Sequence, residues 1–129
     1  MLAKCEEKGL TFIGYAPLGG LATRRGERPL AVKFPACAAV AAVRAAAAAT
    51  RRPPAGGDSH PTLAAAASES PSPEAVYLAY LLRRARRVCS SVLLIVGARR
   101  VEHAVASVGA AYLHLSDDEV ARLDRGWPA

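Results

Sequence analysis

The chain has 129 residues and a formal net charge of +6, with 52% hydrophobic but only 5% aromatic residues. This length fits one domain and excludes a complete (β/α)8 barrel, which needs roughly 250 residues. Much of the hydrophobic content is alanine, which buries little apolar area, so we expect a thin core.

The basic residues are mostly arginines that occur in pairs along the chain. Aromatic residues are not interleaved with them, and no nucleic-acid motif is present, so we expect no nucleic-acid partner. Two explanations of the charge stay open. One is a coding bias that favours Ala, Arg, Gly and Pro. The other is an anionic partner, such as a cofactor that carries phosphate.

The cysteines and the apolar segments predict a cytoplasmic protein without a metal site. Cys5, Cys37 and Cys89 are widely spaced and do not form a metal-ligand pattern. The first ten residues are charged and do not resemble a secretory signal. The longest apolar stretch, residues 36–49, is dominated by alanine and interrupted by Arg44, so we expect no membrane association.

Residues 1–20 predict the end of a helix followed by a strand. Residues 1–8 have helical character, and Gly9 stands where a helix C-cap places glycine. Residues 10–16, LTFIGYA, are apolar with little polar alternation, which is typical of a strand buried on both faces of a parallel sheet. The turn sequence PLGG ends this strand.

Residues 21–59 form a low-complexity stretch rich in Ala, Arg and Pro. Residues 35–50 have the alanine content of a helix, and residues 51–59, RRPPAGGDS, predict a loop. Because no steady hydrophobic period runs through the stretch, we interpret it as an insertion or a linker.

Residues 60–129 predict a helix-strand-helix-helix unit. A short helix is expected over 60–70, and a longer one over 72–87, with Ser72 as its N-cap. Residues 91–97, SVLLIVG, predict a second buried strand. The gap between the two strands is too long for a hairpin, so a helical crossover makes them a parallel pair. Helices over 98–111 and 115–126 complete the unit, and the second begins with a Ser116–Glu119 capping box.

Two short sequences carry candidate chemistry. In YAPLGG, an aromatic ring ends a strand and glycines follow, which allows stacking on a ligand ring and close approach of backbone amides to phosphate. In GARRVEH, residues 97–103, arginines precede a helix start, where an anion is favoured. Each also has an ordinary structural explanation: a core tyrosine with a turn, and the solvated beginning of a helix.

Four sequences in this order resemble the C-terminal part of the aldo-keto reductase family: YAPLGG, SPEAVYLAYLL, VLLIVGARRVEHAVASV and LSDDEVARLD. The resemblance covers residues 1–20 and 60–124. It implies an α/β fold, a C-terminal fragment of a (β/α)8 TIM barrel whose two strands are the last two of eight. It also implies NADPH as cofactor and reduction of an aldehyde or ketone to an alcohol.

The resemblance further implies a set of cofactor-binding residues. Tyr15 would stack on the nicotinamide ring. Pro17, Leu18 and Gly19 would line the pyrophosphate, and the 2′-phosphate of adenosine would be held by Gly97, Ala98, Arg99 and His103. The sequence departs from the family at Ala106 and Ser107, where the usual Glu-Asn pair helps to bind adenine, and at Val96, where proline is common.

Catalytic residues are not predicted for this chain. The family's catalytic Asp, Tyr, Lys and His belong to the first half of the barrel, which the resemblance does not cover. Tyr77 and Tyr80 are expected to face the core. We therefore expect a cofactor-binding fragment without catalysis, which takes a small carbonyl substrate only if the missing half is supplied. The alternative is a non-catalytic module that binds a nucleotide or anion, or a partner protein through exposed strand edges.

Overall fold

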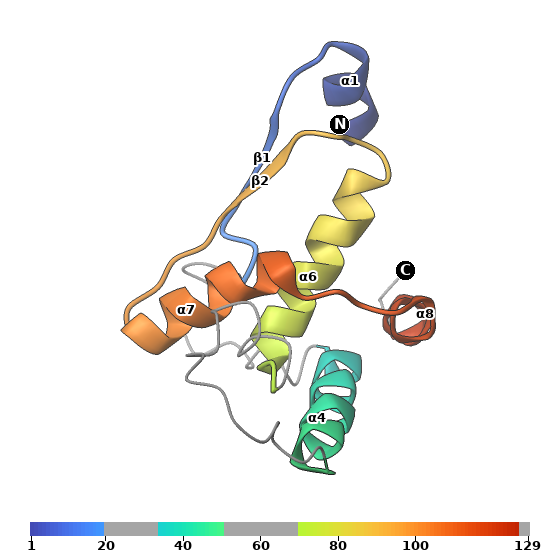
Figure 1. Cartoon of the computed structure of the whole chain (residues 1–129). Helices are drawn as coiled ribbons and strands as arrows, with labels where there is room; N and C mark the ends of the chain where they lie inside the picture. The colour runs from blue at the N-terminus through green and yellow to red at the C-terminus, as the bar shows by residue number, and fades with distance from the viewer. Residues whose placement is uncertain (20–33, 51–69, 127–129) are drawn as a thin grey trace, which may run out of the picture.

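The computed structural model describes residues 1–19, 34–50 and 70–126 of the chain. In these segments two strands and five α-helices follow one another with one short 3-10 helix, η1 (Figure 1). In chain order they are α1 (Leu2–Glu7), β1 (Phe12–Tyr15), α4 (Pro35–Thr50), α6 (Pro73–Arg86), β2 (Val92–Ile95), α7 (Val101–Gly109), η1 (Ala110–Tyr112) and α8 (Asp117–Arg125). The helix expected over 60–70 lies outside the described residues, apart from its last residue.

The two strands pair in parallel, as the sequence predicted. Phe12 is paired with Val92, and the register continues to Tyr15 opposite Ile95. Figure 1 shows the strands side by side, with α6 between them in sequence as the last part of the crossover. The parallel arrangement places the carboxyl ends of both strands at one edge of the sheet.

The prediction that both strands are buried on two faces is wrong for the described structure. In each strand, half-buried and exposed residues alternate. Leu94 of β2 packs against Ala75 and Leu78 of α6, whereas Ile13 and Leu93 remain 55% and 51% exposed on the other face. The reason is that α6 covers one face of the pair, and no described element covers the second.

Helix α6 forms the centre of the molecule, because an unbroken run of its residues, Ala75 to Tyr80, is buried. Its start follows the prediction: the Ser72 hydroxyl accepts a hydrogen bond from the amide of Ala75 at 3.2 Å, and Pro73 occupies the first turn. Arginines follow in its last turn, where the negative end of the helix dipole favours cations.

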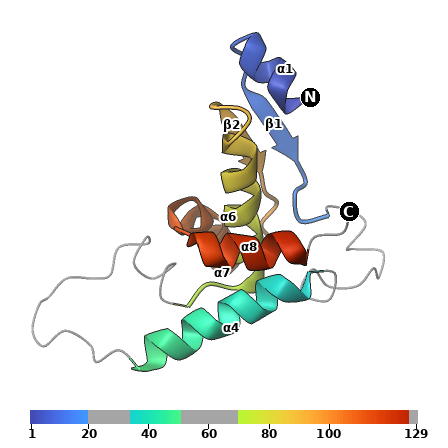
Figure 2. The same cartoon turned by 90° about the vertical axis from the view of Figure 1, so that its right-hand side faces the viewer.

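The larger apolar cluster lies between α4, α6 and α8 (Figure 2). Its buried members are Cys37, Val40 and Ala41 from α4, Val76, Tyr77, Ala79 and Tyr80 from α6, and Leu113, Leu115, Val120 and Leu123 from the last part of the chain. Part of the stretch that the sequence set apart as an insertion or linker, residues 35–50, is therefore a helix that contributes to this core. The division of the chain at residues 20 and 59 stays a prediction.

The C-terminal helices begin close to the predicted positions. Helix α8 has the expected capping box: the Ser116 hydroxyl accepts from the Glu119 amide, and the Glu119 carboxylate accepts from the Ser116 amide at 2.7 Å. Helix α7 begins at Val101, three residues later than predicted, because the chain bends at residues 99–100 and Arg100 keeps an extended backbone conformation as the N-cap. Within the described segments, each helix is too short or too polar to cross a membrane.

Candidate functional site

The candidate site lies at the carboxyl edge of the strand pair. Because Tyr15 and Ile95 are register partners, the chain leaves both strands at the same edge. Residues 16–19 follow β1 and residues 96–100 follow β2. These two segments contain six of the eight predicted cofactor-binding residues. Of the other two, Tyr15 is the last residue of β1, and His103 lies in the first turn of α7.

The loop after β1 is a tight turn held by its own backbone. The amide of Gly19 donates to the carbonyl of Ala16 at 2.9 Å, and these two residues have φ values of 96° and 50°. The left-handed region is accessible to glycine but uncommon for alanine, so Ala16 marks a constrained backbone position. Leu18 packs against both apolar clusters and thereby fixes the loop to the rest of the molecule.

Tyr15, the last residue of β1, is 83% exposed. The alternative of a core tyrosine is therefore wrong for this residue. Its ring stands on the open face of the sheet, the side opposite to α6. An exposed aromatic ring beside a fixed turn can stack on a flat ligand without displacing other side chains.

The loop after β2 presents cationic groups and backbone amides to solvent. Gly97, Ala98 and Arg99 are exposed, and the space where a Cβ of Gly97 would stand is open. The residue before α7, Arg100, makes no capping hydrogen bond with its side chain, so the first amides of the helix lack that partner. Glu102 in the same turn adds one opposing negative charge.

The structure places the second loop and α7 along a path that leads away from the sheet. Figure 1 shows the chain after β2 continuing past the end of β1 before α7 begins. Tyr15 ends β1, whereas His103 belongs to the first turn of α7, so this path separates the two residues. An extended ligand would be required to contact both.

A pocket of about 350 Å³ lies between the beginning of α6 and the first turns of α7. Pro71, Ala75, Val101 and Val105 supply apolar walls, and Glu102 stands among its polar residues. Sequence reasoning missed this pocket. The available signal was the spacing of the two valines, four residues apart on one face of α7. Val101 is 74% exposed and Val105 is 39% exposed.

The side chains that replace the family's usual adenine-binding pair have different positions. Ala106 lines the pocket beside α7. The hydroxyl of Ser107 donates to the carbonyl of His103 at 2.8 Å and so is bonded to its own helix. Neither offers the charged and amide groups that a Glu-Asn pair would supply.

The tyrosines of α6 lie in the core, as predicted. Tyr77 stacks on Phe34 with a centroid distance of 4.8 Å. The hydroxyl of Tyr80 donates to Asp124 at 2.5 Å and accepts from Arg84 at 3.0 Å. Burial, followed by the hydrogen bond with Asp124, raises the pKa of Tyr80. Neither tyrosine is placed to donate a proton at the strand ends.

The described segments contain no clustered set of metal-ligating side chains. No group of three His, Cys, Asp or Glu side chains there could hold a metal ion. His60 lies outside the described residues, and His114 is exposed on the link between η1 and α8. The three cysteines are free thiols, and Cys37 and Cys89 are buried.

The parallel strands, the covering helix and the turns at the strand ends define an incomplete α/β barrel unit. The sequence matches the family described as "Aldo/keto reductase family" over residues 1–127, and the chain belongs to this family. Membership of this family supports the assignment of the chain to the oxidoreductases. No curated protein and no solved structure matches the chain.

The family match extends beyond the resemblance found in the sequence. It also spans residues 21–59, which the four resembling sequences do not include, so the restriction to residues 1–20 and 60–124 is not confirmed. Members of the family generally use nicotinamide cofactors and carbonyl substrates.

Proposed function

We propose that this chain is the NADPH-binding C-terminal part of an aldo-keto reductase barrel, active on aldehydes or ketones only together with the remaining strands. One observation carries the proposal: the register of β1 and β2 makes YAPLG, residues 15–19, and VGARR, residues 96–100, leave the sheet at one edge. Ligands of α/β barrels bind at this edge, because the loops that follow the strands meet there.

The residues at this edge suit a dinucleotide in an extended conformation. The exposed ring of Tyr15 offers a stacking surface for the nicotinamide ring. The turn closed by the Gly19–Ala16 hydrogen bond supports a role of Pro17, Leu18 and Gly19 in lining the pyrophosphate. Bound NADPH would supply the hydride for carbonyl reduction, and these residues would hold and orient it.

The 2′-phosphate is assigned to the loop after β2. Arg99 can donate two charge-assisted hydrogen bonds to phosphate oxygens, with Gly97 and Ala98 allowing close approach. The first turn of α7, with His103, adds partial positive charge. The apolar pocket between Val101, Val105 and Ala75 has room for a flat ring, which supports an adenine position there despite the absence of the Glu-Asn pair.

Catalysis is not assigned to this chain by itself. General acid catalysis requires a donor within about 3 Å of the substrate oxygen. Tyr77 and Tyr80 are buried in the core, and the family's catalytic half is proposed to lie outside this sequence.

The free thiols of the described segments support the proposed location in a reducing cytoplasm.

The test is calorimetric titration with NADPH and NADH, which differ only in the 2′-phosphate. Arg99→Ala should weaken NADPH binding about tenfold or more and leave NADH binding nearly unchanged, because a hydrogen bond to a charged group contributes about 1.5–3 kcal/mol. The matched control is Arg125→Ala, which removes an exposed arginine from α8. Equal losses for both cofactors would contradict the phosphate assignment.

A second function is favoured by the uncovered face of the sheet. Ile13, Tyr15, Leu93 and Ile95 are all at least 47% exposed there. A contiguous apolar surface of this kind is typical of a protein interface. If the parent chain binds neither cofactor but associates through this face, the chain is an interaction module. Substitution of Leu93 by Lys would then abolish the association, measured by sedimentation velocity.

A further inference from the structure

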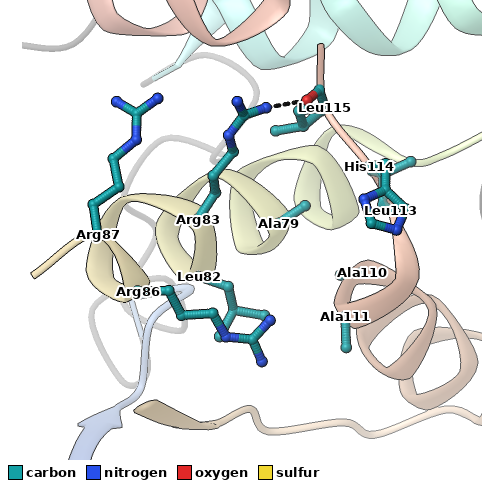
Figure 3. Close-up of a pocket in the computed structure, with 10 residues that line it drawn as sticks. All are labelled: Ala79, Leu82, Arg83, Arg86, Arg87, Ala110, Ala111, Leu113, His114 and Leu115. Atoms are coloured by element: carbon teal, nitrogen blue, oxygen red, sulfur yellow. Dashed lines mark hydrogen bonds between the residues drawn. The ribbon is translucent and has the colours of Figure 1, made fainter. Parts of the chain in front are cut away.

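A second pocket, separate from the strand-end site, opens between α6 and the link from η1 to α8. We call it the arginine groove: its volume is about 540 Å³, and Arg83, Arg86 and Arg87 line its α6 side, with Ala110, Ala111 and His114 among the residues opposite (Figure 3). Arg87 precedes β2 and Gly97 follows it. The part of the groove that Arg86 and Arg87 form is therefore at the amino end of β2, and no predicted cofactor-binding residue lines the groove.

The charged residues that line the arginine groove are all positive. Three guanidinium groups line it, and none of its lining residues is acidic. Arg83 already has partners within the protein: it donates to the Leu115 carbonyl and to the Asp117 carboxylate, the latter at 2.5 Å. Arg86 and Arg87 form no ion pair with any residue of the described segments. The helix dipole favours arginines here, but it does not neutralise them.

The geometry separates the roles of these arginines. Figure 3 shows Arg83 and Arg87 extending from α6 in one direction and Arg86 in another, toward the wall that contains Ala111. The small alanine side chains of that wall leave open space, and Leu82 adds an apolar surface next to Arg86. Of the two arginines that form no ion pair with a described residue, Arg86 is the one that extends along this apolar floor.

We propose that the arginine groove binds a small organic anion, with its phosphate or carboxylate on Arg86 and its apolar body against Leu82 and Ala111. The guanidinium fork matches either anion with two parallel hydrogen bonds. The volume lies within the range of roughly 300–1,000 Å³ that is usual for small-molecule sites. Burial of the apolar body against Leu82 and Ala111 adds a favourable free energy that a free inorganic ion lacks, while the anionic group compensates the guanidinium for its loss of water contacts.

The proposal is tested by titration of the full chain with phenyl phosphate and with benzoate, followed by heteronuclear NMR. Benzyl alcohol, which is neutral, serves as the control ligand. At least one anion should shift the resonances of α6 and of residues 110–115, and the comparison of the two anions identifies the preferred head group. The neutral compound should bind at least tenfold more weakly, as expected when a charged hydrogen bond is lost.

Variants locate the binding. Arg86→Gln and Ala111→Leu should each weaken binding of the preferred anion about tenfold, the first by removing the donor and the second by filling the space. Lys8→Gln, which removes an exposed charge at the end of α1, should change the affinity less than twofold. Saturation with NADPH should leave anion binding unchanged.

Three results would overturn the proposal. The first is the absence of shifts with both anions at millimolar concentration. The second is an equal loss of affinity for Arg86→Gln and Lys8→Gln, which would indicate attraction to net charge only. The third is a loss with Arg99→Gln but not with Arg86→Gln, which would place the anion at the strand ends. None of these depends on whether the chain binds NADPH.

Discussion

Arg44 and Glu119 form a bidentate ion pair that joins two helices from distant parts of the chain. Arg44 Nε donates to Glu119 Oε1 at 2.6 Å, and Arg44 Nη2 donates to Oε2 at 2.7 Å. The same guanidinium donates to the carbonyl of His114. Because Glu119 also caps α8 through Ser116, one carboxylate both starts α8 and attaches α4 to it.

Removal of this ion pair should destabilise the chain. Both side chains are only about a fifth exposed, at 20% and 18%, so solvent screens the pair weakly. We expect Arg44→Ala to lower the free energy of unfolding by about 1.5–3 kcal/mol, measured by urea denaturation. Helix propensity works against this loss, since alanine is the better helix former. The control, Lys4→Ala, breaks an exposed pair with Glu7 and should change stability by less than about 0.5 kcal/mol.

Stability should also fall in acid. The hydrogen bond from Arg44 lowers the pKa of Glu119 below its ordinary value of 4.5. The folded state therefore favours the carboxylate, and its stabilisation is present above that value and lost as the pH falls through the lowered pKa. Unfolding midpoints measured across this range should decline less steeply for Glu119→Gln than for the parent chain. Identical pH profiles would contradict the role of this carboxylate.

The thiols report whether α4 is packed on the core. Burial, with a contribution from Glu74, raises the pKa of Cys37 to about 11. At a pH of about 8 its thiolate is scarce, so alkylation by iodoacetamide should be slow. Cys5 on α1 is only half-buried and should react first. Mass spectrometry of digested protein gives the order, and equal rates for the two residues would mean that α4 is not held on α6 and α8.

Hydrogen exchange should separate the two halves of the fold. The amides of α6 from Ala75 to Tyr80 belong to a buried helix and should exchange slowly. Those of β1 and β2 belong to a two-stranded sheet with one open face and should exchange much faster, because such a sheet has little independent stability. Equal protection of strands and helix in a monomer would show that the pair is stable without further strands.

Turnover by the chain alone should be negligible. The tyrosines of α6 are held in the core by contacts such as that of Tyr80 with Asp124, so they are not available as acids at the strand ends. Oxidation of NADPH with an aldehyde, followed by absorbance, should stay below about 0.1 per second, against roughly 1–1,000 per second for typical enzymes. A higher rate would contradict this prediction. If Tyr15→Ala kept that rate, the catalytic group would be a residue other than Tyr15.

Local sequence signals were sufficient for the elements that have their own start and end signals. Ser72 with Pro73 fixed the start of α6, and Ser116 with Glu119 fixed that of α8. The parallel pairing of the strands followed from the long connection between them, which rules out a hairpin. These features depend on neighbours in the sequence or on connection length, so the amino-acid sequence by itself determined them.

Tertiary structure decided which faces of these elements are covered. Residues 35–50 are dominated by alanine and have no distinct apolar stripe, so their sequence did not indicate that Cys37 and Val40 face a core or that Arg44 meets Glu119. The sequence likewise did not indicate that Ile13 and Leu93 are exposed, or that Arg86 and Ala111 line one groove. Each is a contact, or a missing contact, between segments far apart in the chain, and the packing of those segments in space determines it.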